Sequence, residues 1–406
     1  MKHTLSLLLP YIFGLTCTAT FAQPWLFHKP VDVTNTSQPG VFHHLESAGR
    51  RNVAVSKDTV AIVWEDDHEG APGIYLARKS ISENSFTTVI RISGKGEAYE
   101  PGIMALTNNH FALAWEEGEH VYARIVGPEA IGPALMLGNS TTAQASIATN
   151  GKQIFVALSE RSKRHGRVML YQLQINNQLK LLTNYSCFVD PAPPEEEQLY
   201  PVVSVLDKHI VVAWEDRRPG HTIIMAGQSK LDDVCEFGSP VRISEKPEGP
   251  KMPYGAGHGV ARVALANYGQ SRLFAVWADK RNFQEGYDIY GAGKQGSDAF
   301  TSNVRVQDDF GGESRQWHST VTGHPDGKLA VAWTDERDGT ADIWLSWLEG
   351  GVWSDDLLLD GASGPGEQAH PSIVMDAKGN FHAAWVERAS VGGATRLRYL
   401  FGQAVN

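Results

Sequence analysis

The chain has 406 residues, of which 36 are basic and 46 acidic, giving a formal net charge of −10 at pH 7. The acidic balance, with no basic cluster and no aromatic-plus-basic RNA motif, excludes nucleic acid as an expected partner. No stretch beyond the first 22 residues is apolar and long enough to predict a membrane span.

Residues 1–22 have the features of a secretory signal peptide. Lys2 precedes an apolar core from Leu5 to Leu15, and cleavage is expected after Ala22. The core is too short to span a bilayer well. We therefore expect an exported protein, 23–406, in the periplasm or outside the cell. Losing Lys2 leaves 35 basic against 46 acidic residues, a formal charge of −11.

One pattern recurs seven times in the remaining chain: a short strand, a tight turn, a second strand that usually ends in tryptophan, and an acidic loop. The second strand and its loop read TVAIVWEDDHEG, HFALAWEEGEH, QIFVALSERSKRHG, HIVVAWEDRRPG, RLFAVWADKRNFQEG, KLAVAWTDERDG and NFHAAWVERASVGG. Turns rich in Asp, Asn and Gly suit hairpins, and alternating, β-branched segments predict strands on both sides.

The spacing of the repeats predicts an all-β fold, a single-domain seven-bladed β-propeller over 23–406. Successive repeat positions lie 51, 43, 56, 63, 56 and 52 residues apart, the size of a four-stranded blade. The third repeat has leucine instead of tryptophan, so a six-bladed ring with one aberrant unit is the alternative. The tryptophans are expected to pack between blades. The repeat positions are Trp64, Trp115, Leu158, Trp214, Trp277, Trp333 and Trp385.

The two ends of the chain predict how the ring closes. The last repeat runs through its third strand, TRLRYLFG, and lacks a fourth, whereas the segment KPVDVTN near the start resembles the missing strand. A strand from one end that completes the blade at the other removes open sheet edges.

Two cysteines remain after signal cleavage, Cys187 and Cys235. In an oxidising compartment we expect a disulfide between them. The alternative is two buried thiols.

The segments AWEDRRPG, VWADKRNFQEGYDIY and AWTDERDGTADIW resemble repeats of the sialidase-like, BNR-type propeller superfamily. The resemblance covers nearly the whole mature chain and implies a propeller fold with carbohydrate chemistry. A clean Ser-x-Asp-x-Gly-x-Thr-Trp box is absent, and neither an arginine triad nor a tyrosine nucleophile can be assigned. Sialidase activity itself is therefore not expected.

Strand order places the loops after the second strands and before the first strands on one side of the disc, which predicts the working face around the channel mouth. An acidic residue follows each repeat position by two places, and a basic one often by four. This near-sevenfold pattern predicts structural ion pairs. The acidic residues are Asp66, Glu117, Glu160, Asp216, Asp279, Asp335 and Glu387, and the basic ones are His68, Arg218, Arg281 and Arg337.

A second polar set precedes the first strands and differs from blade to blade, as a ligand site requires. It comprises Arg51, Tyr99, Glu100, Gln144, Tyr200, His258, Arg262, Trp317, His318 and His370. From this set Arg51, Tyr99, Glu100, Trp317 and His370 are predicted to bind ligand.

The sequence predicts an exported propeller that binds a carbohydrate-related ligand, another small molecule or a partner at this face. One alternative is a polysaccharide lyase, with His258 or His318 as base, Tyr200 as acid and Arg262 neutralising a carboxylate. A second is a glycoside hydrolase, for which Glu100 with Asp216 or Asp279 would be the carboxylates.

A third alternative is a protein-interaction scaffold without catalysis. No cofactor is predicted. Calcium is the one metal that the acidic loops could hold, and zinc-type spacing is absent. The oligomeric state is left open.

Overall fold

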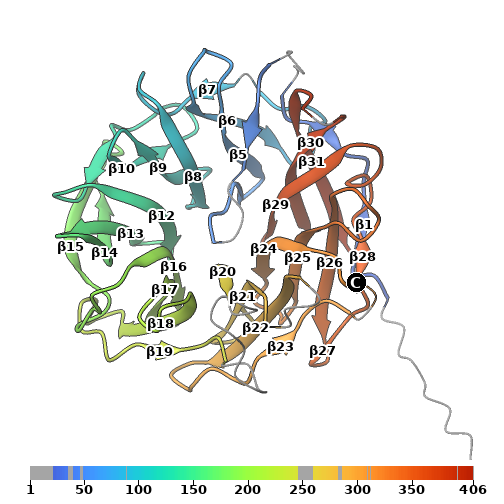
Figure 1. The fold of residues 1–406 in the computed structure, drawn as a ribbon. Coiled ribbons are helices and arrows are strands. Elements are labelled where there is room, and N and C mark those ends of the chain that lie inside the picture. The colour runs from blue at the N-terminus through green and yellow to red at the C-terminus, as the bar shows by residue number, and fades with distance from the viewer. Residues whose placement is uncertain are drawn as a thin grey trace, which may run out of the picture.

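The computed structural model describes residues 22–34, 40–45, 49–87, 89–245, 259–281, 286–308, 310, 312–390 and 392–405. These residues form seven antiparallel sheets arranged around a central axis (Figure 1). Seven blades are therefore confirmed, and the six-bladed alternative is wrong. The described ranges contain no α-helix, and among these residues there is no helix long and apolar enough to cross a membrane.

Each blade runs outward from the axis in strand order. Blade I contains β3 (His43–His44), β4 (Val53–Ser56), β5 (Thr59–Asp66), β6 (Gly73–Ser80) and β7 (Ile90–Arg91). Blade II contains β8 (Ala98–Ala105), β9 (Phe111–Glu117), β10 (His120–Val126) and β11 (Leu135–Leu137). Blade III contains β12 (Thr142–Thr149), β13 (Ile154–Ser162), β14 (His165–Ile175) and β15 (Leu181–Phe188). Blade IV contains β16 (Gln198–Leu206), β17 (His209–Asp216), β18 (Ile223–Lys230) and β19 (Val241–Arg242).

The remaining blades follow the same plan. Blade V contains β20 (Val260–Tyr268), β21 (Arg272–Asp279), β22 (Asp288–Gln295) and β23 (Val304–Arg305). Blade VI contains β24 (Gln316–Gly323), β25 (Leu329–Asp335), β26 (Asp342–Glu349), β27 (Val352–Trp353) and β28 (Leu357–Leu358). Blade VII contains β29 (Glu367–Met375), β30 (Phe381–Arg388) and β31 (Thr395–Ala404), with β1 (Trp25–Phe27) and β2 (Val31–Asp32) outside them.

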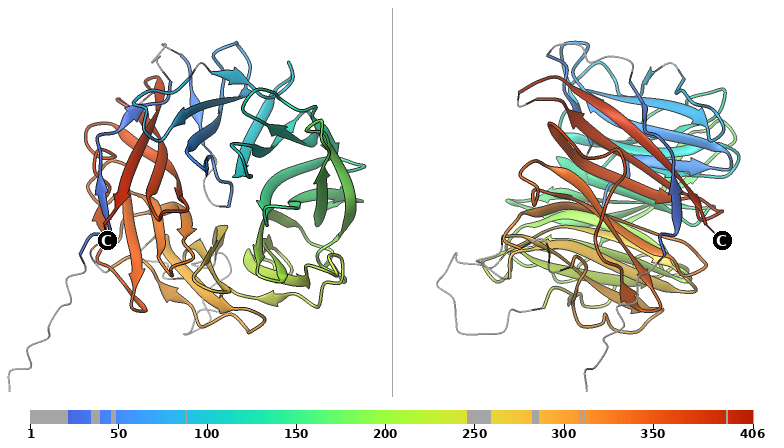
Figure 2. Two further views of the ribbon diagram at one scale, coloured as in Figure 1. Left: turned by 180° about the vertical axis from the view of Figure 1, so that it is seen from behind. Right: turned by 90° about the vertical axis from the view of Figure 1, so that its right-hand side faces the viewer.

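The ring closes by pairing the two ends of the chain, as predicted. In blade VII, β31 pairs antiparallel with β1 and β2, in a register that sets Trp25 opposite Ala404 and Val31 opposite Tyr399. Figures 1 and 2 show this blue N-terminal segment against the red C-terminal strands. The buried Trp25 also donates its indole N–H to the carbonyl of Gly379 at 2.9 Å, so the closing strand is anchored by a side chain as well.

The core lies between neighbouring blades and is built around the repeated tryptophans. All six are at most 1% exposed, and Leu158 in the third repeat is equally buried. Most of the indoles donate a hydrogen bond to the acidic residue two places on, for example Trp214 to Asp216 at 3.0 Å. A buried indole N–H requires such an acceptor, which explains why the acidic position recurs with the tryptophan.

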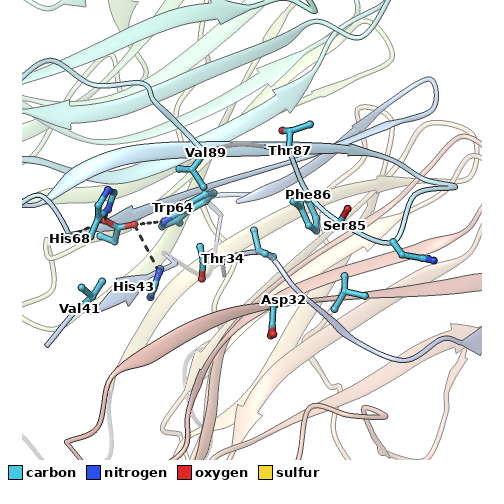
Figure 3. Close-up of a pocket in the computed structure, with 14 residues that line it drawn as sticks. Asp32, Thr34, Val41, His43, Trp64, His68, Ser85, Phe86, Thr87 and Val89 are labelled. Carbon is cyan, nitrogen blue, oxygen red and sulfur yellow. Dashed lines mark hydrogen bonds and ion pairs between the residues drawn. The ribbon is translucent and has the colours of Figure 1, made fainter. Parts of the chain in front are cut away.

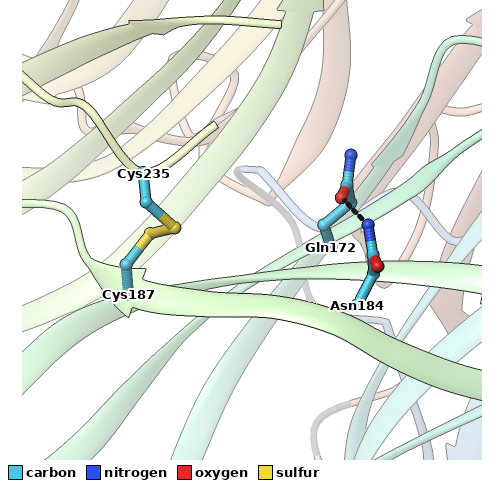
Figure 4. The surroundings of a disulfide bond; sticks show 4 residues. All are labelled: Gln172, Asn184, Cys187 and Cys235. Atoms are coloured by element: carbon cyan, nitrogen blue, oxygen red, sulfur yellow. Dashed lines mark hydrogen bonds between the residues drawn. A yellow bond between two sulfur atoms is a disulfide. The ribbon is translucent and has the colours of Figure 1, made fainter. Parts of the chain in front are cut away.

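Cys187 and Cys235 form the expected disulfide, with 5.7 Å between their Cα atoms (Figure 4). The bond joins the end of β15 in blade III to the segment after β18 in blade IV. It thus ties an exposed outer strand to the neighbouring blade. Beside it, Asn184 donates to Gln172 at 2.7 Å across two strands of blade III.

Candidate active or binding site at the channel mouth

The innermost strands of blades II to VII share one irregularity close to their starting ends. In each, a β-bulge interrupts the pairing with the second strand, and its first residue has positive φ although it is not glycine. Such a backbone is uncommon for these residue types and is often found at functional sites. We call these six residues the inner ring: Glu100 (φ 51°), Gln144 (φ 61°), Tyr200 (φ 50°), Arg262 (φ 58°), His318 (φ 52°) and His370 (φ 56°).

Several bulges are held by a side chain from the preceding blade. Glu65 accepts the backbone N–H of Glu100 at 3.1 Å, and Glu215 accepts that of Arg262 at 2.8 Å. Glu116 accepts the N–H of Gln144 at 2.5 Å in the same way. These glutamates follow the tryptophan by one residue, not two. Sequence reasoning missed them because it considered only the more regular second position.

A buried ion cluster occupies one side of the mouth. Arg50, which is 5% exposed, places Nη2 2.9 Å from Oε2 of Glu100 and 3.7 Å from Oε1 of Glu116. Burial, followed by the charge of Glu100, raises the pKa of Glu116 to about 7, although Arg50 opposes the shift. Two carboxylates sharing one cation cannot both ionise without cost, so this cluster takes up a proton near neutral pH.

Arg262 and Tyr200 form a stacked pair from adjacent blades. The guanidinium carbon of Arg262 lies 3.4 Å from the centre of the Tyr200 ring. The backbone of Tyr200 is fixed in turn, because its N–H donates to the Gln144 side chain at 2.9 Å. Stacking pre-organises a guanidinium for planar, two-point recognition of a carboxylate.

A row of aromatic rings from three blades continues the mouth. The rings of Trp317 and His318 stack at 4.6 Å between centroids, and those of His318 and His370 at 4.0 Å. His44 of blade I meets His370 edge-on at 5.0 Å. Trp317 remains 37% exposed, so the row presents an aromatic surface of the type on which a sugar ring packs. His44 was not singled out in the sequence.

Blade I departs from the bulge pattern. Its inner strand pairs with β5 at His43–His44 and again at Val53–Ser56, and of the segment between them residues 45 and 49–52 are described. Gly49 (φ 90°) reaches the opposite side of the ring, where a Cβ would overlap Val202 and lie 2.7 Å from the carbonyl oxygen of Val263. We call residues 49–52 of this segment the plug.

Hydrogen bonds from several blades fix the plug. Ser146 donates to the carbonyl of Gly49 at 3.3 Å, and the N–H of Ile103 donates to that of Arg51 at 2.8 Å. Asn52 donates to the carbonyl of Pro101 at 3.0 Å. Figure 1 shows the blue segment beside β5 extending toward the centre of the ring. The plug therefore lies across the central channel, and we call the face of the channel mouth that carries the inner ring the bowl.

The structure brings together most of the predicted site residues and separates two of them. Glu100, Tyr200, Arg262, His318 and His370 belong to the inner ring, and Trp317 stacks beside it. Tyr99 precedes the ring, and its hydroxyl donates to Glu97 at 2.8 Å. Arg51 points away from the bowl. His258 lies outside the described residues.

The contacts of Arg51 show why it does not join the inner ring. Its Nη2 lies 3.3 Å from the carbonyl oxygen of Leu265, and its Nη1 lies 3.8 Å from the sulfur of Met104. Both partners lie in the later halves of β20 and β8, whereas the inner ring lies near the starts of such strands. The structure thus places Arg51 apart from the inner ring, beside the later halves of the inner strands.

The acidic residues two places after the tryptophans form a separate, structural set, which we call the outer ring: Asp66, Asp216, Asp279 and Asp335. Asp335 receives Trp333 Nε1 at 3.0 Å and Arg337 Nη2 at 2.7 Å. Asp216 and Asp279 are buried and held in the same manner. They are occupied by the fold, which removes them as partners of Glu100 in a two-carboxylate hydrolase.

A cavity of about 640 Å³ lies apart from the inner ring, where blade VII meets blade I (Figure 3). Here His68 replaces the arginine of the outer ring and contacts Asp66, while His43 places Nε2 4.0 Å from the same carboxylate. Burial lowers the pKa of His43, although Asp66 opposes the shift. Within the described residues, no group of three or more His, Cys, Asp or Glu side chains is arranged to hold a metal ion.

Comparison with known proteins identifies the fold. No protein-family model matches the chain, and no curated protein matches it. Polysaccharide lyase Uly1 has a similar structure, with a TM-score of 0.61 and 9% identity over 94% of this chain and 100% of that one. A protein of unknown function from Dyadobacter fermentans has a TM-score of 0.55 and 11% identity, covering 95% and 100% of the two chains.

The α-L-arabinanase of Penicillium chrysogenum, solved with arabinobiose, has a TM-score of 0.50 and 10% identity, covering 93% of this chain and 98% of that one. At these identities the likeness shows the propeller fold alone.

Proposed function

We propose that the bowl at the channel mouth binds an acidic carbohydrate, a glycan whose sugars carry carboxylates. The observation that carries this proposal is the guanidinium of Arg262 stacked 3.4 Å above the Tyr200 ring within the same ring of bulges as His318 and His370. A fixed guanidinium recognises a carboxylate, and aromatic rings recognise the apolar face of a sugar.

Arg262 is the anion-binding group that we propose, because its guanidinium is stacked on Tyr200 within the inner ring. The protein as a whole is acidic, so its overall field repels an acidic polymer. A specific cation in the bowl must therefore supply the attraction.

The comparisons support a carbohydrate ligand without naming it. Two of the similar structures are, by name, a polysaccharide lyase and an arabinanase. The resemblance of the repeats to the sialidase-like superfamily points to the same class of ligand.

A lyase is the second candidate, and the contact between Tyr200 and Arg262 favours it over a hydrolase. Arg262 would neutralise the uronate carboxylate, and His318 would remove the proton on the carbon beside it. The C–O bond to the next sugar then breaks, and the Tyr200 hydroxyl protonates the leaving oxygen. The product is an unsaturated uronate and a new chain end. His258 stays an alternative base from the sequence.

We also propose that the protein acts outside the cytoplasm. The Cys187–Cys235 disulfide fits an oxidising compartment, and residues 1–22 have the pattern of a signal peptide. This location would bring the bowl into contact with extracellular polysaccharide.

Incubating residues 23–406 with polygalacturonate, alginate and neutral arabinan tests both candidates. We expect binding to the two acidic polymers and none to arabinan, measured by affinity electrophoresis. Ultraviolet absorbance from an unsaturated uronate would identify a lyase, and binding without it leaves the binding function alone. Equal retention by arabinan, or none by either acidic polymer, would overturn the proposal.

A further inference from the structure

A further cavity lies at the other end of the central channel, on the side of the plug that faces away from the inner ring. It has a volume of about 240 Å³ and is bounded by the plug and the later halves of inner strands. Among the residues that line it, Arg51 carries the only formal charge. The walls are mainly apolar and include Ile147, Val202, Leu265 and Pro325.

The guanidinium of Arg51 contacts only neutral groups among the described residues. Its two hydrogen bonds go to the carbonyl of Leu265 and the sulfur of Met104, at 3.3 and 3.8 Å. Burial lowers the pKa of Arg51, with no acidic neighbour opposing the shift. A guanidinium has five N–H donors, and a cation in apolar surroundings is costly without a counter-charge.

The other polar side chains of the cavity are largely committed to the protein. Ser204 donates to Asn267 at 2.9 Å, and Asn267 donates to the carbonyl of Val205. Thr149 donates to the carbonyl of Gln153 at 2.8 Å. Arg51 is thus the main donor toward an occupant. A guanidinium can hold a carboxylate through two parallel N–H···O bonds, and the single positive charge of Arg51 matches a monoanion.

We propose that this cavity binds a small aliphatic carboxylate, with Arg51 pairing its carboxylate group and the apolar walls enclosing its hydrocarbon part. A water molecule takes about 30 Å³, so the cavity of about 240 Å³ has room for a short-chain acid together with some water. The plug separates this site from the bowl, so the proposal does not rest on the proposed function.

Calorimetry with sodium butyrate as the probe tests the proposal on residues 23–406. We expect saturable binding by the natural chain and at least tenfold weaker binding by Arg51→Met, which keeps the length of the side chain but removes its charge. Arg161→Met is the matched control: Arg161 is exposed on blade III, and its loss changes the net charge equally. That variant should bind butyrate unchanged.

Arg51→Lys provides a second route if Arg51→Met fails to fold. It keeps the charge but loses the two-point geometry, so we expect weaker butyrate binding than in the natural chain. Absence of butyrate binding by the natural chain overturns the proposal, as does unchanged binding by the Arg51 variants. Binding of inorganic phosphate in preference to butyrate overturns the ligand class. Displacement of butyrate by polygalacturonate fragments overturns the separation from the bowl.

Discussion

The inner and outer rings lie on the same face of the disc and use similar residue types, yet they differ in regularity. The outer ring repeats: a buried aspartate accepts a tryptophan N–H and, in blades IV, V and VI, an arginine two residues on. The inner ring has five different residue types at six equivalent bulges. The fold requires the same stabilising contacts in every blade. A ligand lacks sevenfold symmetry, so a site that binds it requires different residues from blade to blade.

Two arginines show the contrast most directly. Arg281, which is bound to Asp279 of the outer ring at 2.6 Å, stacks 3.9 Å from the Tyr290 ring. Arg262 of the inner ring makes the same kind of stack on Tyr200 at 3.4 Å, but its backbone is held in a bulge. The same kind of side chain is therefore part of a loop ion pair in one place and of the inner ring in the other. The following predictions test whether the residues of the outer ring determine stability and those of the inner ring determine ligand binding.

The largest effect is expected from the outer ring. Asp335→Ala removes a fully buried carboxylate that accepts from both Trp333 and Arg337. We expect a loss of about 3–5 kcal/mol in the free energy of unfolding, because a buried indole N–H loses its acceptor and Arg337 loses one of its carboxylate partners, keeping Asp356 at 2.7 Å. Urea denaturation measures the loss. Asp360→Ala, at an exposed position, should stay within about 0.5 kcal/mol. Similar losses for both variants would contradict a structural outer ring.

A smaller loss is expected from the plug. Gly49→Ala places a Cβ against Val202 and Val263 and forces a side chain into φ 90°. We expect about 2–3 kcal/mol, from backbone strain together with overpacking. Gly70→Ala is matched in backbone, with φ 92° and no atom within 4 Å, and isolates the strain. If the two variants lose equal stability in urea, Gly49 makes no essential contact across the channel.

The third test compares the two arginines as a pair. Arg262→Gln should lower affinity for polygalacturonate about tenfold, or about 1.4 kcal/mol. Arg281→Gln should lower stability, because Asp279 loses its partner, and leave affinity unchanged. Affinity electrophoresis and urea denaturation on the same preparations separate the effects. A reversed outcome would assign ligand binding to the outer ring.

The fold was more predictable from sequence than the site. The tryptophan spacing and the N-terminal strand predicted seven closed blades, because every blade must bury the same core position and complete its sheet. All six bulge residues were in the predicted second polar set, since they lie at the starts of recognisable strands. Arg51 lies apart from them because the inner strand of blade I starts at His43 and is interrupted. Glu116 was missed because only the second position after each tryptophan was considered, and Arg50 because only contacts between blades reveal it.

The smallest effect concerns proton uptake, where the rings should differ in pH range. Glu116 has a pKa of about 7 in the folded protein against an ordinary value of 4.5, raised first by burial and then by Glu100. Between these values the folded state binds more protons than the unfolded state, so this contribution to stability falls as pH rises from about 4.5 to 7. Because Glu116 and Glu100 titrate as a coupled pair, we expect an effect on stability of about 1 kcal/mol, below the full value of the shift.

Asp216 in the outer ring behaves oppositely. Burial acts to raise its pKa, but hydrogen bonds from Arg218 and Trp214 outweigh burial and lower it. The contribution of Asp216 to the free energy of unfolding is therefore present at neutral pH and lost only in acid. Urea denaturation of the natural chain and Glu116→Gln at pH 5 and pH 8 tests the contrast, because the glutamine can still accept from Gln144 but cannot titrate. A stability difference between the two proteins that is equal at both pH values would show that Glu116 does not titrate in this range, and the glutamate that holds the Gln144 bulge would then differ from Asp216 in no way that pH reveals.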